Sequence, residues 1–313
     1  MSLVPVWPVC LRVVFRRVGC GMALKPAWIA GWTGQHARHA AAMIRQGRNP
    51  AARVYESIGS DFFVAPAPGW LNLGLWEGPG SEGEAGDACR RLVTTLASAL
   101  PAGGVILDAG NGLGTQDPLI AEVVRPRRLV AVNITEWQLM AGRERLREAA
   151  AAAVAGDAAR LPVADATIDG VISVEAAFHF RSRKAFFDEC YRVLRPGGVL
   201  SISDIPVQRW PVSPAELLAG LTQLRVFGLR PSMAMTAGQI AAAARAAGLA
   251  EVEVTVCGDR VIAPALRLAA ARLAGVTAAP AGQQTAARLL LRQVDLLWRR
   301  QIIDYLLLRA VRP

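Results

Sequence analysis

The fold of this chain is decided by residues 105–114, which read Val-Ile-Leu-Asp-Ala-Gly-Asn-Gly-Leu-Gly. The stretch starts as an apolar run typical of a buried strand, passes into three alternate glycines, and precedes helical spacing over 116–124. The carboxyl end of the first strand of a parallel sheet borders the ligand crevice, and glycines there permit positive φ and a close approach of ligand to backbone. The stretch predicts a strand, a ligand-binding loop and a helix. A plain tight turn is the alternative for the loop.

The spacing of this loop argues against a dinucleotide and for a cationic ligand. A pyrophosphate site has the spacing G-x-G-x-x-G with an acid about twenty residues on. Here the spacing is G-x-G-x-G, and the second predicted strand ends near Asn133. Asp108 stands just ahead of the first glycine, where a carboxylate repels a pyrophosphate and suits a ligand that carries an ammonium group. The loop therefore favours a cofactor that resembles a cationic amino acid.

Short apolar runs alternate with helical segments through much of the chain. Strands are expected at 105–109, 129–134, 152–155, 170–174, 199–204, 251–256 and 304–310. Helices are expected at 35–54, 84–100, 116–124, 136–149, 182–194, 237–247 and 262–300. This β-α-β rhythm predicts an α/β fold in which helices cover both faces of a mostly parallel sheet.

Further motifs follow the glycine loop in a fixed order. They are Val-Asn-Ile-Thr-Glu-Trp-Gln at 132–138, Gly-Asp-Ala-Ala-Arg-Leu-Pro at 156–162 and Tyr-Arg-Val-Leu-Arg-Pro-Gly-Gly at 191–198. Together with 107–114, they resemble the class I S-adenosylmethionine-dependent methyltransferases, in the branch that acts on small natural products. Upstream, Trp-Leu-Asn-Leu-Gly-Leu-Trp at 70–76 resembles the segment that closes over the cofactor in that branch.

The resemblance implies a Rossmann-like sheet of seven strands, mostly parallel, whose last strand is antiparallel. Residues 101–313 are then the methyltransferase core, with lid insertions at 205–235 and 260–300. Residues 35–100 are expected to form a helical cap at the amino-terminal side. Residues 1–34 are interpreted as an extension, and Met22 is an alternative start of the native chain.

The resemblance also implies S-adenosyl-L-methionine as cofactor and assigns residues to it. The three glycines of the loop would line its methionine and ribose portions, with Asp108 near the amino group. Asn133 takes the place of the acid that usually binds the ribose hydroxyls, so a charge-assisted hydrogen bond is missing there. Asp157 and Ala158 fall at the adenine position. The full set of cofactor residues expected is Asp108, Gly110, Gly112, Gly114, Asn133, Ile134, Gln138, Asp157, Ala158 and Glu175.

Two candidate catalytic residues follow the fourth strand of the core. His179 can take a proton near neutral pH, so it is the candidate general base for an acceptor hydroxyl; substrate or cofactor hydrogen bonding and a structural role are the alternatives. Glu175 would hold the cofactor or orient the histidine. The same Glu-xxx-His spacing resembles sterol and isoprenoid C-methyltransferases, so alkene methylation competes with O-methylation. The chemistry requires no metal, and none is expected.

The acceptor is expected to be a small apolar molecule that lies beneath an apolar lid. Substrate contacts are assigned to Trp76, Phe178, Trp210, Phe227 and Met233. Ordinary core packing is the alternative interpretation of such aromatic and methionine spacing. The helical segment at 262–300 either covers the pocket or builds the face of a homodimer.

The net charge of +10 invites a nucleic-acid partner, but its distribution argues against one. Residues 1–54 hold eight Lys or Arg and no acid, whereas residues 55–204 hold fourteen Lys or Arg against nineteen acids. The segment expected to bind cofactor is thus mildly acidic. A nucleic-acid methyltransferase, a catalytically silent binding module of the same fold and a nicotinamide oxidoreductase are the rival functions.

The cysteines and the amino terminus favour the cytoplasm. Five cysteines show no CxxC pair and only three histidines are present, which suits a reducing compartment without a zinc site. Residues 3–20 are apolar but interrupted by prolines and arginines, so they predict neither a membrane-spanning helix nor a secretory signal. A segment that rests on a membrane surface is the alternative.

Overall fold

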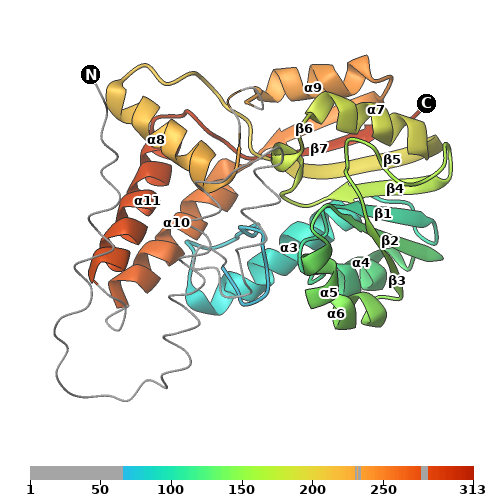
Figure 1. Cartoon of the computed structure of the whole chain (residues 1–313), viewed down its shortest axis with the longest axis horizontal. Coiled ribbons are helices and arrows are strands. Elements are labelled where there is room, and N and C mark those ends of the chain that lie inside the picture. Colours follow the sequence, from blue (N-terminus) through green and yellow to red (C-terminus); the bar gives the residue numbers. More distant parts are fainter. Residues whose placement is uncertain (1–65, 230, 232–233, 276–280) are drawn as a thin grey trace.

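The computed structural model describes residues 66–229, 231, 234–275 and 281–313 (Figure 1). The expected extension at 1–34 with Met22, the helix at 35–54 and Met233 lie outside these residues.

A single sheet of seven strands forms the centre of the described chain, in the order β3-β2-β1-β4-β5-β7-β6. The strands are β1 (Val105–Ala109), β2 (Arg128–Asn133), β3 (Ala151–Ala155), β4 (Ile168–Ser173), β5 (Leu194–Asp204), β6 (Ala250–Val256) and β7 (Leu306–Val311). Strands β1 to β5 pair in parallel, and β7 runs antiparallel to both β5 and β6. The sequence-based prediction of a seven-stranded sheet with an antiparallel last strand is confirmed.

Helices lie on both faces of the sheet and beside it. They are α3 (Ala85–Ala97), α4 (Asp117–Val124), α5 (Glu136–Ala141), α6 (Arg143–Glu148), α7 (Arg183–Val193), α8 (Pro214–Val226), α9 (Ala237–Ala246), α10 (Gly258–Gly275) and α11 (Ala281–Arg299), with short 3₁₀ turns η1 (Glu82–Glu84) and η2 (Ala177–His179). Figure 1 shows α7 and α9 on one face and α3 and α4 on the other, with α8, α10 and α11 packed together beside the sheet.

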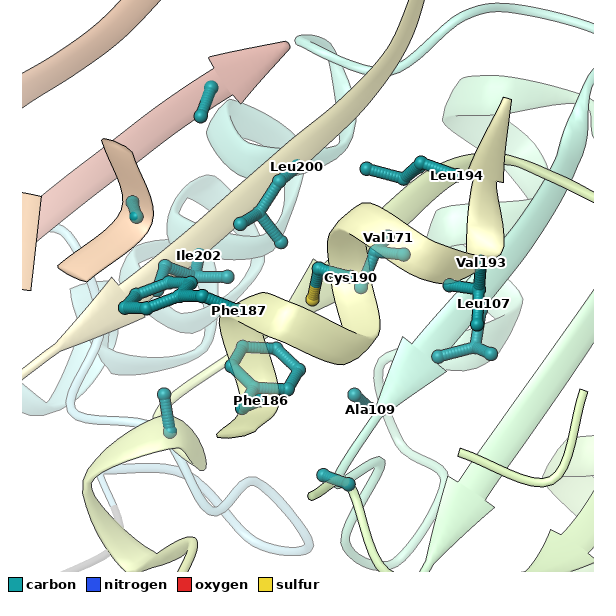
Figure 2. Packing of buried hydrophobic residues seen from close by; sticks show 14 of the residues in the cluster. Leu107, Ala109, Val171, Phe186, Phe187, Cys190, Val193, Leu194, Leu200 and Ile202 are labelled. Atoms are coloured by element: carbon teal, nitrogen blue, oxygen red, sulfur yellow. The ribbon is translucent and has the colours of Figure 1, made fainter. Parts of the chain in front are cut away.

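The alternation of apolar residues along the strands fills a separate core on each face. In β1, Leu107 joins the cluster under α7 and α9, whereas its neighbour Ile106 joins the cluster under α3 and α4. Figure 2 shows Cys190 of α7 beside Val171, and Val193 of α7 beside Leu107, all in one buried cluster. Each large side chain buried in this way contributes roughly 1.5–3 kcal/mol, which fixes the strands that carry the loops of the site.

Local sequence explains where the helix α7 begins. The Ser182 hydroxyl oxygen accepts a hydrogen bond from the Ala185 N–H at 3.1 Å and so caps the first turn.

Two expectations about helices are corrected. The single helix predicted over 262–300 is two helices, α10 and α11. The helix predicted over 136–149 divides into α5 and α6 at Gly142, whose backbone has a φ of −87° and a ψ of 0°. A Cβ there would lie 2.5 Å from the Leu113 carbonyl oxygen, so the close approach requires glycine. Within the segment predicted as a lid from residue 260 onwards, Val261 and Ile262 of α10 belong to the buried cluster under α3 and α4. The lid itself stays a prediction.

Candidate functional site

A cavity opens at the carboxyl ends of the strands, where the sequence predicted a ligand. Its walls come from the loops after β1, β2, β3 and β4 and from a segment that we call the strap, residues 69–76. The lining residues are Gly69, Trp70, Leu71, Gly110, Asn111, Gly112, Leu113, Thr115, Gln116, Val132, Asn133, Ile134, Thr135, Gln138, Gly156, Asp157, Ala158, Val174, Glu175, Ala176, His179, Phe180 and Arg181.

The glycine loop forms the wall after β1, and two of its glycines are required by geometry. Gly110 has a φ of +82°, and a Cβ there would lie 2.5 Å from the Ala176 Cβ. Gly112 has a φ of +58°, and a Cβ there would lie 3.0 Å from the Leu71 side chain of the strap. Gly114 does not line the cavity. The loop thus lets the strap and the segment after β4 approach it closely.

Asp108 was expected at the amino group of the cofactor, but it does not line the cavity. Its side chain is fully buried, and Oδ2 accepts a hydrogen bond from Gln116 Nε2 at 2.6 Å. Burial raises the pKa of Asp108 well above its usual value, and the nearby charge of Asp117 raises it further. Gln116, which was not among the predicted residues, lines the cavity instead of Asp108.

The loop after β2 carries three of the predicted cofactor residues. Asn133 Nδ2 donates to the Gly112 carbonyl and to Gln138 Oε1, both at 3.1 Å, so this amide holds the loops together. Gln138 Nε2 is buried without a hydrogen-bond partner although its side chain lines the cavity. Ile134 also lines the cavity and is 46% exposed. A ligand hydroxyl would satisfy the Gln138 amide.

The loop after β3 places Asp157 and Ala158 on the wall, as the sequence predicted for an adenine site. Asp157 Oδ1 accepts from the Ala159 N–H at 2.8 Å, and Oδ2 lies 3.1 Å from Nε of Arg181. Arg181 was not predicted, and it also lines the cavity. A ligand amine at Asp157 would therefore share the carboxylate with an arginine.

Glu175 follows β4 and connects the strap to the sheet. Its Oε1 accepts hydrogen bonds from the Leu73 N–H at 2.7 Å and from the Tyr305 hydroxyl at 2.8 Å. Its own N–H donates to Ser203 Oγ at 2.9 Å. These bonds hold a non-glycine residue at a φ of +50°, a conformation that costs energy. Burial raises the pKa of Glu175 to about 7, although both accepted hydrogen bonds lower it.

His179 lies at the end of η2, and its side chain lines the cavity. Burial, and next the charge of Arg183, lower its pKa to about 3, while a hydrogen bond with the backbone of Phe227 opposes this. The imidazole is therefore neutral at pH 7. His179 lies on the cavity wall, where a base would act, but a pKa this low makes it a weak base at pH 7. Its role as general base stays a prediction.

Four residues predicted to contact the substrate do not line the cavity. Trp76 is 1% exposed and packs in the core against α3 and α10, with Nε1 donating to the Leu73 carbonyl at 2.8 Å. Phe178 is buried beside the His179 ring, 4.1 Å between centroids. Trp210 is 62% exposed, and Phe227 contributes a backbone group to His179.

Two aromatic residues nearby in sequence line the cavity in place of Trp76 and Phe178. Trp70 and Phe180 both line the cavity. The Trp-x₅-Trp pattern of the strap contains the signal for Trp70 but does not say which tryptophan turns inward. Asn111 and Gln116 stand within and just after the glycine loop, a position that could have marked them as wall residues.

The described residues contain neither a membrane-spanning helix nor a cluster of metal ligands. No helix among them combines the length and the apolar character needed to cross a membrane. In the same part of the chain, His, Cys, Asp and Glu side chains nowhere gather in threes as a metal site would require. Cys89, Cys190 and Cys257 are buried and unpaired with one another.

Comparison with known proteins gives a matching family. Residues 107–202 match a family model described as a methyltransferase domain. The chain is 37% identical over 161 residues to the erythromycin 3''-O-methyltransferase of Saccharopolyspora erythraea, an alignment that covers 50% of this chain and 52% of that protein. The chain spans about half the length of the first curated relatives that it matches.

Solved structures share the fold at low sequence identity. The geranyl diphosphate C-methyltransferase of Streptomyces coelicolor superposes with a TM-score of 0.65 at 15% identity, covering 84% of this chain and 97% of that one. The [4+2]-cyclase SpnF superposes with a TM-score of 0.60 at 20% identity, covering 89% and 96%. At these identities the likeness shows the fold alone.

Proposed function

We propose that this chain, whose residues 107–202 match a methyltransferase domain, is a class I S-adenosylmethionine-dependent methyltransferase that transfers a methyl group to a hydroxyl of a small apolar natural product. The observation that carries the proposal is the glycine-walled cavity at the carboxyl ends of β1, β2 and β4, inside the matched domain. The O-methyltransferase among the relatives supports a hydroxyl as the acceptor group.

The residues of the cavity fit S-adenosyl-L-methionine. Gly110 and Gly112 leave room that a Cβ would fill. The orphaned amide of Gln138 offers a hydrogen bond to a ribose hydroxyl, and Asp157 offers one to an exocyclic amine. When bound, the cofactor supplies a methyl group already activated on a sulfonium sulfur.

The chain's own task is then alignment and exclusion of water. Leu71 and Trp70 of the strap lie on the wall and would shield the reacting atoms. Glu175 holds this strap through the Leu73 N–H. His179, neutral because burial lowers its pKa to about 3, would accept the proton of the acceptor hydroxyl at an imidazole nitrogen. We therefore propose that Glu175 positions the strap and that His179 is the base, whereas the sequence analysis expects Glu175 to hold the cofactor or to orient the histidine.

C-methylation of an isoprenoid or sterol-like alkene is the second candidate. The rings of Trp70 and Phe180 and the carboxyl group of Glu175 line the same cavity, and such groups stabilise a carbocation. A sterol 24-C-methyltransferase of Eremothecium gossypii is 33% identical over 109 residues, covering 34% of this chain and 29% of that protein. A silent module of the same fold is the alternative from another class.

The proposed acceptor is a small molecule and not a nucleic acid, because the residues that line the cavity belong to the segment 55–204, which is mildly acidic. We also propose that the chain acts in the cytoplasm, and that a homodimer is the form to test by its mass in solution.

Calorimetry and product analysis test the proposal. The full chain is titrated with S-adenosyl-L-methionine and S-adenosylhomocysteine, then incubated with a methyl-labelled cofactor and apolar alcohols, phenols and isoprenoids. Binding at micromolar concentration with label on oxygen supports O-methylation; label on carbon moves the assignment to the second candidate. Absence of binding at millimolar concentration would overturn the enzyme assignment and favour the silent module.

A further inference from the structure

Helix α8 presents leucines to the outside of the molecule. Leu217, Leu218 and Leu221 are each more than half exposed. Residues three and four positions apart share one face of a helix, so these side chains form a continuous apolar strip. Arg225 follows one turn after Leu221 on the same face and is also exposed. Figure 1 shows α8 beside α11, at the opposite end of the molecule from α5 and α6.

The other face of α8 is polar and is committed to protein. Glu216 and Gln223 are both buried. Glu216 Oε1 lies 2.8 Å from Nη2 of Arg209, and Gln223 Nε2 donates to the Leu290 carbonyl of α11 at 3.3 Å. A surface helix normally turns its apolar stripe toward the core and its polar residues toward water. Because α8 is inverted in this respect, its leucines indicate an interaction surface.

The segment before α8 extends the strip. Trp210 and Val212 are 62% and 84% exposed. Pro211 lies between them against α8, with its Cγ 3.7 Å from the place of a Cβ at Gly220. The segment therefore borders the helix rather than projecting away from it. We use the name apolar face for Trp210, Val212, Leu217, Leu218 and Leu221.

The surroundings of the apolar face are positively charged. Residues 207–229 and 281–300, which contain α8 and α11, hold six arginines and two acids. Both acids already pair with an arginine, Glu216 with Arg209 at 2.8 Å and Asp295 with Arg299 at 2.7 Å. The remaining charge is positive, so the surface favours an occupant that supplies negative charge.

This charge argues against two occupants that the chain itself could provide. Residues 1–54 hold eight Lys or Arg and no acid, so they would add positive charge to an arginine-rich surface. A second copy in a two-fold dimer would present the same surface to itself, and like charges would meet. A different protein would have to pair hydrogen bonds across the interface. The apolar face offers only the Trp210 indole N–H as a polar side-chain group.

We propose that the apolar face docks the protein on the surface of an anionic lipid bilayer. The leucines and Val212 would enter the boundary between headgroups and acyl chains, as on helices that lie in the plane of the interface. Trp210 suits the headgroup level, where tryptophan is enriched. The arginines would lie at the lipid phosphates and attract the negative surface. This surface role is additional to methyl transfer and independent of cofactor binding.

Co-sedimentation of the full chain with lipid vesicles tests the proposal. One set of vesicles contains phosphatidylglycerol and phosphatidylcholine in equal parts, and the other contains phosphatidylcholine alone. Binding should be at least about 10-fold tighter to the anionic vesicles, because several arginines face them. It should weaken as the salt concentration rises, because salt screens exposed charges.

Substitutions on α8 locate the binding surface. Leu218→Ser and Leu221→Ser should each lower binding to anionic vesicles by about 10-fold, because each removes apolar area that would enter the bilayer. Arg225→Gln should lower it by about 5-fold at low salt. Met140→Ser is the matched control: Met140 of α5 is 59% exposed, close to the 64% of Leu218, but lies at the opposite end of the molecule (Figure 1). Its vesicle binding should equal that of the wild type.

Three results would overturn the inference. The first is absence of binding to anionic vesicles, or binding that neither leucine substitution weakens. The second is a dimer in sedimentation equilibrium that Leu218→Ser and Leu221→Ser dissociate, which would assign the face to a second copy. The third is a large loss of stability in both leucine variants, since exposed sites change stability little and such a loss would mean that the chain covers the face itself. None of these measurements uses methyl transfer, so the proposed function is judged separately.

Discussion

The loops after β1, β2 and β4 differ from helix α8 in what their polar side chains face. In the loops, Asn133 and Gln138 are buried yet line a cavity. In α8, Glu216 and Gln223 are buried against protein groups, whereas Leu218 is 64% exposed. Gln138 Nε2 has no hydrogen-bond partner and is left for a ligand, whereas Glu216 and Gln223 pair with protein groups and serve packing. Chemistry should therefore be confined to the loops, with α8 contributing only where it touches them.

His179 is the point at which the two regions meet, because it lines the cavity and forms a hydrogen bond with the backbone of Phe227, the residue that caps the carboxyl end of α8. His179→Ala should lower turnover by about 10²- to 10⁴-fold, the usual scale for general acid–base catalysis. The affinity for S-adenosylhomocysteine should persist. Because burial lowers the pKa of His179 to about 3, its ionisation should not appear in the kcat profile between about pH 5 and 9.

His179→Gln separates the two roles, because glutamine keeps a hydrogen-bonding group but cannot act as a base. Turnover as low as that of His179→Ala would support the base. Turnover restored by glutamine would assign His179 to positioning instead.

Gly110 gives the next largest effect and tests the loop alone. Gly110→Val places a branched side chain at a φ of +82°, where even a Cβ would lie 2.5 Å from the Ala176 Cβ. The affinity for S-adenosylhomocysteine should fall by about 100-fold or more, since strain and overlap each cost on the order of 1–3 kcal/mol. Calorimetry measures the loss, with unfolding curves to verify the fold.

Gly220→Ala is its counterpart in α8. The nearest atom to a Cβ there is Pro211 Cγ at 3.7 Å, and alanine suits a helix interior better than glycine. Binding should not change, and stability should rise by about 0.5–1 kcal/mol. A loss of binding in this variant would break the contrast between loop and helix.

The strands and the positions of the loops could be predicted because their causes are local. Buried apolar runs pair into the sheet, and the residues that directly follow them, such as Gly110 and Asp157, reach one edge. The contacts of Glu175 could not be predicted, since Leu73 and Tyr305 lie 102 and 130 residues away in sequence. Such partners meet only after the sheet has closed.

The misplaced residues show the same limit. Trp70 and Trp76 belong to one strap, but the Trp76 N–H donates to the Arg260 carbonyl at 2.8 Å, and this contact with α10 turns its ring into the core. Asp108 precedes the first glycine as expected, yet Gln116 eight residues on covers it. In both cases the residue type and its place in the motif could be read from the sequence. The direction of the side chain depends on a contact with a residue that only the fold brings near.

Glu175 sharpens the comparison through pH, with an effect smaller than that of Gly110→Val. Burial raises its pKa to about 7 in the folded chain, so its contribution to stability is present below the unfolded pKa of about 4.3 and is lost as pH rises through 7. Relative to Glu175→Gln, wild-type protein should lose an unfolding free energy on the order of 2 kcal/mol between about pH 5 and 8. Glutamine can still accept from Leu73 and Tyr305, so the strap stays bonded. Denaturant unfolding across this range measures the difference, and a wild-type advantage that grows with pH would contradict the assignment.

Trp210 should give the smallest effect, although the sequence assigned it to the substrate. Its side chain is 62% exposed, and it does not line the cavity. Trp210→Ala should therefore change the unfolding free energy by no more than about 0.5 kcal/mol, as exposed sites do, and leave the affinity for S-adenosylhomocysteine unchanged. The KM for the acceptor, measured with the alcohol or alkene found in the labelling screen, decides whether Trp210 contacts the acceptor. An unchanged KM keeps the chemistry in the loops after the strands. A KM that rises tenfold while the cofactor affinity holds would make the segment before α8 part of the acceptor site, because no other route links this exposed ring to the reaction.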